Sequence, residues 1–201
     1  PYIGFTKSPP YGYLHVIFTD YDGHMSGIPY AIMYNRITDL MYPSWEGWVT
    51  IETEGNGPFY AFYADPFSKT LVLTYCRRSS DYHIIMLVDT MGGEMFYAWI
   101  PIQIDVSQEI QNAGYPYYMG FIHDGVPFVD RDKNIHLITF GVENYNPIPT
   151  YVYHFSYNIQ TNQSSVHLIE ILQDYYYPIE PGMLLAGRSQ MGEVRASRTL
   201  Y

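Results

Sequence analysis

The chain has 201 residues, with 20 acidic against 10 basic side chains and a net charge of −10 at neutral pH. This charge repels phosphate backbones and anionic lipid surfaces, so the composition argues against nucleic-acid binding. The longest apolar runs, such as Ile84–Val88, are too short to span a bilayer. The single cysteine, Cys76, excludes an internal disulfide.

Aromatic side chains dominate the composition. The chain holds 23 tyrosines, 10 phenylalanines and 3 tryptophans. Aromatic and β-branched residues suit a pleated, half-buried surface, so this content predicts β-strands and no long helices.

The first segments read as short strands between polar turns. Apolar runs at Leu14–Thr19, Ile28–Tyr34 and Trp48–Ile51 are separated by the turn at Asp20–Gly23, and Glu54–Gly57 breaks the pattern. A first unit of about residues 1–57 follows.

The same order recurs over residues 58–114. Strands are predicted at Phe59–Ala64, Thr70–Tyr75, His83–Val88 and Trp99–Ile104, with a turn at 91–93 and one helical turn near Ser107–Ala113. Residues 115–182 form a third unit, and 183–201 read as a partial fourth unit or a tail. Its strands are predicted at Tyr117–Ile122, Pro127–Asp130, Ile135–Phe140, Thr150–Phe155 and Ser165–Ile169.

One stretch occurs more than once. Two segments of the sequence, Asp65–Tyr75 and Asp130–Phe140, align without a gap. Each contains, in order, an aspartate, a polar turn, a predicted strand, a threonine and an aromatic residue. Leu14–Thr19 is a weaker third copy, in which His15 takes the place of His136. A strand unit that recurs in this way predicts a repeat architecture.

The units resemble the sialidase-like or BNR-like β-propeller repeats in three features. They show four strands in a unit, turns with Asp, Asn and Gly, and a tryptophan near the last strand (Trp48, Trp99). The Asp-box of that family is not intact, since Ser44–Gly47 is only a fragment of it, so no catalytic residue is carried over. The resemblance implies an all-β, antiparallel β-propeller of about three blades plus a strand, part of a larger ring. A β-sandwich is the alternative.

An acidic turn offers a possible cation site. Asp130, Asp132 and Asn134 have the spacing that opens a calcium loop, and oxygens on alternate residues of a tight turn converge on a hard cation. Calcium is the only cofactor that the sequence suggests. The competing interpretation is a hairpin turn closed by the aspartate side chain.

Aromatic loops near the unit boundaries are the candidate ligand-binding site. Rings beside amides suit sugar faces and hydroxyls as well as protein surfaces. We expect the following residues on one rim, although the rings could instead pack between neighbouring units: Tyr117, Asn144, Tyr145, Asn146 and Tyr176.

Three functions are compatible with these features. The first is a non-catalytic, extracellular or surface module that binds glycan or protein through its aromatic loops. The second is a structural subunit of a surface assembly such as a virion, a filament or a layer. The third is a propeller-type glycoside hydrolase, which would need two facing carboxylates. We also expect association with further blades or with copies of the chain itself.

Overall fold

The computed structural model describes residues 2–6, 13–37, 42, 44–77, 83–117, 119–121, 127–142 and 149–172. The predicted all-β, antiparallel class is confirmed, because the described residues form strands that pair only with antiparallel neighbours. Two short helices, α1 (Glu94–Tyr97) and α2 (Val106–Asn112), flank one strand. Neither helix is long and apolar enough to cross a membrane, and no other helix occurs in the described ranges.

The strands form three sheets, each of which follows the chain order. The first sheet contains β1 (Tyr2–Thr6), β2 (Tyr13–Asp20), β3 (Ala31–Ile37) and β4 (Val49–Glu52). The second contains β5 (Gly55–Ala64), β6 (Leu71–Arg77), β7 (His83–Asp89) and β8 (Ile102–Asp105). The third contains β10 (Phe128–Val129), β11 (Asn134–Val142), β12 (Thr150–Asn158) and β13 (Gln163–Leu172), and β9 (Met119–Phe121) also pairs with β11.

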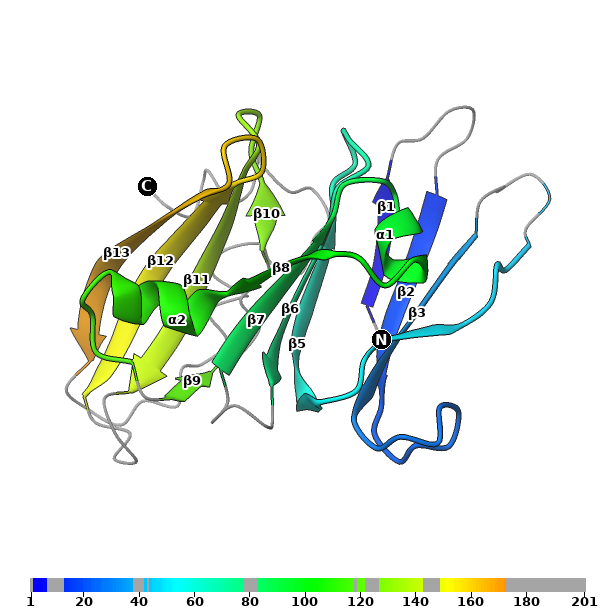
Figure 1. Cartoon of the computed structure of the whole chain (residues 1–201), viewed down its shortest axis with the longest axis horizontal. Helices are drawn as coiled ribbons and strands as arrows, with labels where there is room; N and C mark the ends of the chain where they lie inside the picture. The colour runs from blue at the N-terminus through cyan, green and yellow to red at the C-terminus, as the bar shows by residue number, and fades with distance from the viewer. Residues whose placement is uncertain are drawn as a thin grey trace.

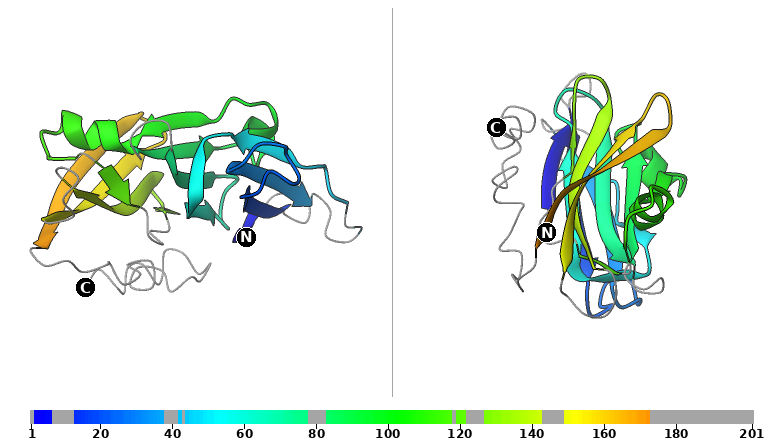
Figure 2. Two further views of the ribbon diagram at one scale, coloured as in Figure 1. Left: turned by 90° about the horizontal axis from the view of Figure 1, so that it is seen from below. Right: turned by 90° about the vertical axis from the view of Figure 1, so that its left-hand side faces the viewer.

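The three sheets are arranged in a row, with the second sheet between the other two (Figures 1 and 2). One hydrophobic core lies between the first and second sheets and includes Ile17, Tyr34 and Phe96. A separate core lies between the second and third sheets and includes Ile110 and Phe155. The second sheet is therefore buried on both faces.

The side chains of β6 and β7 alternate between the two faces of the second sheet and so contribute to both cores. In β6, Leu71, Leu73 and Tyr75 belong to the first core, whereas Val72 and Cys76 belong to the second. Successive side chains of a strand point to opposite faces, so an uninterrupted apolar run can fill a core on each side. The same alternation divides the buried residues of β7: Ile84, Ile85, Met86, Leu87 and Val88.

The predicted secondary structure differs from the observed one at several places. Ile28–Tyr30 lie in a turn and β3 starts at Ala31, because Tyr30 has φ 65° and its N–H donates to Asp20 O. Trp99 precedes β8 in a turn, also with positive φ. Helix α1 was not predicted, since four residues carry no readable helical period. The three sheets span residues 2–52, 55–105 and 119–172.

The ungapped repeat alignment is wrong by one residue within the strand. Asp65 N donates to Thr70 O, whereas Asp130 N donates to Asn134 O, so the β5–β6 turn is one residue longer than the β10–β11 turn. A one-residue shift moves every side chain to the other face. Val72, rather than Leu71, is therefore the structural counterpart of His136.

A polar network crosses the interface between the first two sheets. His15 on β2 hydrogen-bonds Tyr34 on β3, with Nδ1 and Oη 2.8 Å apart. A Cβ atom on Gly93 would lie 1.9 Å from that Tyr34 hydroxyl, so this position requires glycine. Arg36 donates to Gly92 O at 2.5 Å and pairs with Glu46 and Glu94. The turn before α1 is thus held against the first sheet.

Because the central sheet is buried, we expect substitutions in it to destabilise the protein far more than substitutions in an exposed strand. Ile85 is 1% exposed and Ile169 is 52% exposed. Ile85→Ala should lower the free energy of unfolding by about 2–5 kcal/mol, because a core cavity forms. The matched Ile169→Ala variant should change it by about 0.5 kcal/mol or less. Urea denaturation measures both, and equal losses would contradict burial of β7.

The buried His15 predicts loss of stability in acid. Burial, and then the charge of Arg36, lowers the pKa of His15 from 6.5 to about 3. Since the unfolded chain binds this proton first, the free energy of unfolding falls as pH drops from about 6.5 towards 3, by up to about 1.4 kcal/mol per pH unit from this group. His15→Gln should flatten that slope over this range. The exposed His24→Gln should leave it unchanged, and a slope unaltered in His15→Gln would contradict the assignment.

Candidate ligand-binding cleft

A cleft of about 170 Å³ opens where β4 of the first sheet meets the segment that enters β8 of the second sheet. Drug-sized ligands fill pockets of roughly 300–1,000 Å³, so this cleft accommodates one small ring and leaves the rest of a ligand outside. We call it the Trp99 cleft. Its lining residues are Ile51, Glu52, Leu87, Phe96, Trp99, Pro101 and Gln103.

Trp99 occupies a position that normally holds glycine. Its N–H donates to Phe96 O and the next N–H, of Ile100, donates to Met95 O, which is the Schellman arrangement at the end of α1. The residue after such a helix has left-handed backbone, and Trp99 has φ 62°. A bulky residue there is strained by about 1–3 kcal/mol. The Trp99 side chain is nevertheless 63% exposed, so packing does not compensate the strain.

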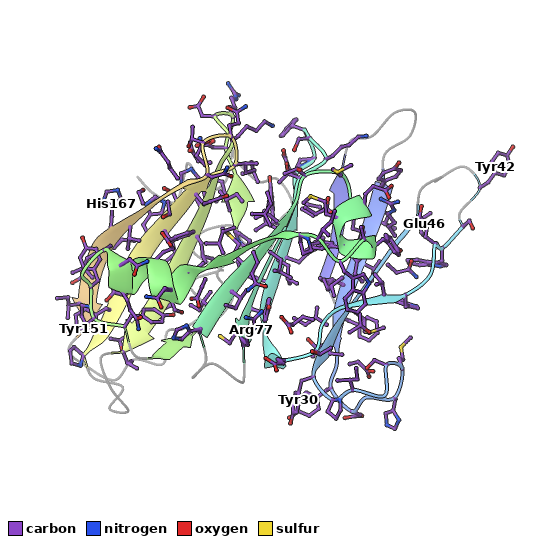
Figure 3. All side chains as sticks on the ribbon, viewed as in Figure 1. Tyr30, Tyr42, Glu46, Arg77, Tyr151 and His167 are labelled. Atoms are coloured by element: carbon purple, nitrogen blue, oxygen red, sulfur yellow. The ribbon has the colours of Figure 1, made fainter. Side chains whose placement is uncertain are left out.

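The polar wall of the Trp99 cleft is formed by Glu52 and Gln103, which belong to a hydrogen-bonded cluster that joins the two sheets. Glu52 Oε2 accepts hydrogen bonds from the Tyr75 hydroxyl and from Arg77 Nη2, the latter at 3.1 Å. Glu52 Oε1 accepts from the backbone N–H groups of Thr53 and Glu54. Arg77, labelled at the lower end of the second sheet in Figure 3, also donates to Gln103 Oε1 at 3.3 Å. This contact orients the Gln103 amide at the cleft.

The electrostatics of the cluster set the charge states of Glu52 and Tyr75. Burial alone would raise the pKa of Glu52, but hydrogen bonds from Tyr75, from backbone N–H groups and from Arg77 outweigh it and lower that pKa. Burial, and then the charge of Glu52, raises the pKa of Tyr75 well above its usual value. Glu52 therefore stays ionised and Tyr75 stays neutral near pH 7. A general acid would need the opposite shift at the carboxyl group.

A second aromatic group lies on the first sheet. Trp45 and Trp48 stack with ring centroids 6.0 Å apart, and Phe18 packs edge-on against Trp48 at 4.8 Å. Trp45 is 51% exposed. Trp48 and Trp99 both precede the fourth strand of their sheet, whereas the sequence had placed each of them at the first position of that strand.

Tyr117 does not lie on an exposed rim. It is 5% exposed and belongs to the core between the second and third sheets. A Cβ atom on Gly141 would lie 2.5 Å from the Tyr117 ring, so the ring fills the space that this glycine leaves. Burial raises the pKa of its hydroxyl well above the usual value. The expectation that Tyr117 stacks on a ligand is therefore corrected, and its ring is a core residue. The other expected rim residues, Asn144, Tyr145, Asn146 and Tyr176, lie outside the described residues.

The acidic turn at Asp130–Asn134 is a hairpin turn closed by its own side chains. Asp130 accepts from the Asn134 backbone N–H at 2.8 Å and from the Asn134 amide at 2.9 Å. Asn134 Oδ1 accepts from Asn158, and Asp132 is exposed. A calcium ion at Asp130 and Asn134 would have to replace these bonds. Across the described ranges, no three His, Cys, Asp or Glu side chains are grouped so that they could hold a metal ion.

Sequence reasoning missed Glu52, Arg77 and Gln103 as partners. They come from three different strands, and no local motif connects them. The recurrence of tryptophan at residues 48 and 99 was the available signal, because it marks an aromatic ring before the fourth strand of two units.

No protein-family model matches this chain, and no curated protein matches it in sequence. The resemblance to sialidase-like repeats consequently remains a prediction from the residues.

Proposed function

We propose that the chain is a non-catalytic β-propeller module that binds glycans at the Trp99 cleft, in an extracellular or surface setting. The observation that carries the proposal is Trp99, a large exposed ring kept in a backbone conformation suited to glycine. Strain at a position that packing does not require points to a role in recognition.

The arrangement of the sheets supports the propeller part of the proposal. The first two sheets are four-stranded meanders in chain order, and the third has the same order over β10–β13 with β9 as an additional strand on β11. Consecutive sheets pack face to face. Propeller blades have this order, whereas the Greek-key connections of a sandwich carry the chain between its two sheets. A propeller has four to eight blades. The blades beyond these three would come from a longer polypeptide, another chain or a second copy.

The chemistry of the Trp99 cleft supports a sugar as its ligand. An exposed indole offers a flat apolar face for the C–H side of a sugar ring. Gln103 lines the same cleft, accepts a hydrogen bond from Arg77 and has an amide N–H group that can donate to a hydroxyl group. A rigid polar wall lowers the entropy cost of binding, because its side chains are already ordered.

Carboxyl chemistry among the described residues supports binding rather than hydrolysis. Hydrolysis of a glycoside needs an acid with a raised pKa opposite a second carboxylate. Asp89 has a raised pKa, caused by burial, but it is fully enclosed and accepts N–H groups from Met91 and Phe96. Glu52 in the cleft has the opposite shift.

Replacing Trp99 by glycine tests the proposal. Glycine adopts a positive φ without steric strain, so we expect Trp99→Gly to leave the melting temperature unchanged or raise it. Because the variant also lacks the indole ring, we expect glycan binding to weaken at least about tenfold. A glycan array identifies the ligand of the parent protein, and calorimetry with that ligand measures the affinity.

The control is Tyr21→Ala, which removes another exposed ring, in the loop between β2 and β3, and should leave binding unchanged. A marked fall in melting temperature in Trp99→Gly would identify Trp99 as a packing residue. If the parent protein binds no glycan but binds a protein surface through Trp99, the ligand in the proposal is a protein and not a glycan.

A further inference from the structure

Three histidines form a row across the outer face of the third sheet, the face turned away from the second sheet. His136 lies on β11, His154 on β12 and His167, labelled in Figure 3, on the edge strand β13. The His136 and His154 ring centroids are 5.2 Å apart, and those of His154 and His167 are 6.2 Å apart. Leu137 and Phe155, the next residues along β11 and β12, belong to the core against the second sheet. Strand alternation therefore places the histidine row on the opposite face.

A carboxylate fixes the tautomers of the first two rings. Burial alone would raise the pKa of Asp130, but hydrogen bonds from His136 and Asn134 outweigh it and lower that pKa, so the carboxylate is ionised near pH 7. Asp130 Oδ2 lies 2.9 Å from His136 Nε2, and His136 Nδ1 lies 3.0 Å from His154 Nε2. A neutral imidazole carries one N–H group, and an ionised carboxylate only accepts. His136 therefore donates through Nε2 to Asp130 and accepts at Nδ1 from the Nε2–H group of His154.

This chain of hydrogen bonds has room for one added proton but not for two. With one added proton, either ring can be the imidazolium while the hydrogen bond between His136 Nδ1 and His154 Nε2 persists. With two, both of these nitrogens carry hydrogen and face each other at 3.0 Å. The hydrogen bond is then lost and two positive charges repel each other. Proton uptake by the two rings is therefore coupled.

His154 lies at the centre of the row and faces a histidine on each side. Partial burial, and then the charges of His136 and His167, lowers the pKa of His154. Directly opposite it lie the apolar Ile138 on β11 and His167 on β13. The Asp130 carboxylate contacts His136 and so favours a proton on that ring. The second proton is consequently the one that charges His154.

The edge strand β13 is the element that can yield to this repulsion. Among the described strands it pairs only with β12, and the register between the two shifts after Val152, close to His154. Such an irregularity disrupts the ladder locally. Two carboxylates approach β13 elsewhere. Glu170 lies opposite Val152 on the far side of the shift, and Glu109 of α2 accepts a hydrogen bond from Ser164.

We propose that His154 is the proton sensor of an acid-triggered opening of the third sheet. When the second proton binds to the row, β13 separates from β12 at the pair formed by His154 and His167, while the first two sheets keep their packing. The opened β12 presents unpaired backbone N–H and C=O groups, to which another strand can bind. This switch goes beyond the proposed function and does not depend on ligand binding at Trp99.

Native-state hydrogen exchange between pH 7 and pH 5, corrected for the intrinsic effect of pH on exchange, tests the switch. An opening that takes up one extra proton becomes about tenfold more frequent per pH unit as the pH falls below the ordinary histidine pKa of about 6.5. We expect the β13 amides of the parent protein to lose protection at about that rate. His154→Gln should abolish this pH dependence, because its amide still donates to His136 but takes up no proton.

His24→Gln is the matched control, because His24 lies in the loop between β2 and β3 and its side chain is 84% exposed. This variant should show the same pH dependence of β13 as the parent protein. Amides of β6 are the internal reference, since the acid effect of His15 acts on the first core. Equal pH dependence of β13 in the parent protein and in His154→Gln would overturn the proposal, as would an equal acid-induced loss of protection in β6 and β13.

Histidine NMR resonances of the parent protein give a second measurement that needs no variant at the sensor. His136 and His154 should take up their protons in two separate steps as the pH falls, with the later step accompanied by shifts of the β13 amide resonances. Independent titration of the two rings at the same pH, or a later step without a change in β13, would contradict the proposal.

Discussion

The structure depends on the second sheet, whose strands β6 and β7 are apolar on both faces. Their alternating side chains fill one core against the first sheet and another against the third. A sheet buried on both sides needs apolar side chains on both faces, and β6 and β7 supply them, with Thr74 the one polar residue among Leu71–Cys76. The Trp99 cleft occurs where this sheet meets the first sheet, so the packing that stabilises the fold also shapes this cleft.

Strand positions were predictable wherever the apolar run ended at a turn residue. The predicted segments lie wholly within β2, β7, β11 and β12, and β6 contains all of its predicted segment except Thr70. Two features required three-dimensional information. Tyr30 adopts positive φ because the loop after Asp20 closes on the Asp20 carbonyl oxygen, and this delays β3. The extra residue in the turn after Asp65 reverses the faces of β6 relative to the sequence alignment, and an ungapped comparison does not detect it.

The candidate sites were less predictable than the fold. Glu52 and Arg77 lie on different sheets and meet only because those sheets pack together. Trp99 is distinguished by its backbone conformation, which a single sequence does not reveal. Tyr117 was expected to contact a ligand because tyrosines crowd that loop, but the space beside Gly141 draws its ring into the core. Positive φ at an exposed, bulky residue was the more informative signal.

Native-state hydrogen exchange tests most directly whether the doubly buried second sheet holds the fold together. Backbone amides in the most deeply buried regions exchange their hydrogens slowly, because the openings that expose them to water are rare. The account predicts that the amides of Leu71–Arg77 and His83–Asp89 exchange last, after those of the edge strand β13, whose outer residues Ile169 and Ile171 are exposed. Exchange of β6 and β7 as fast as that of β13 would contradict the account.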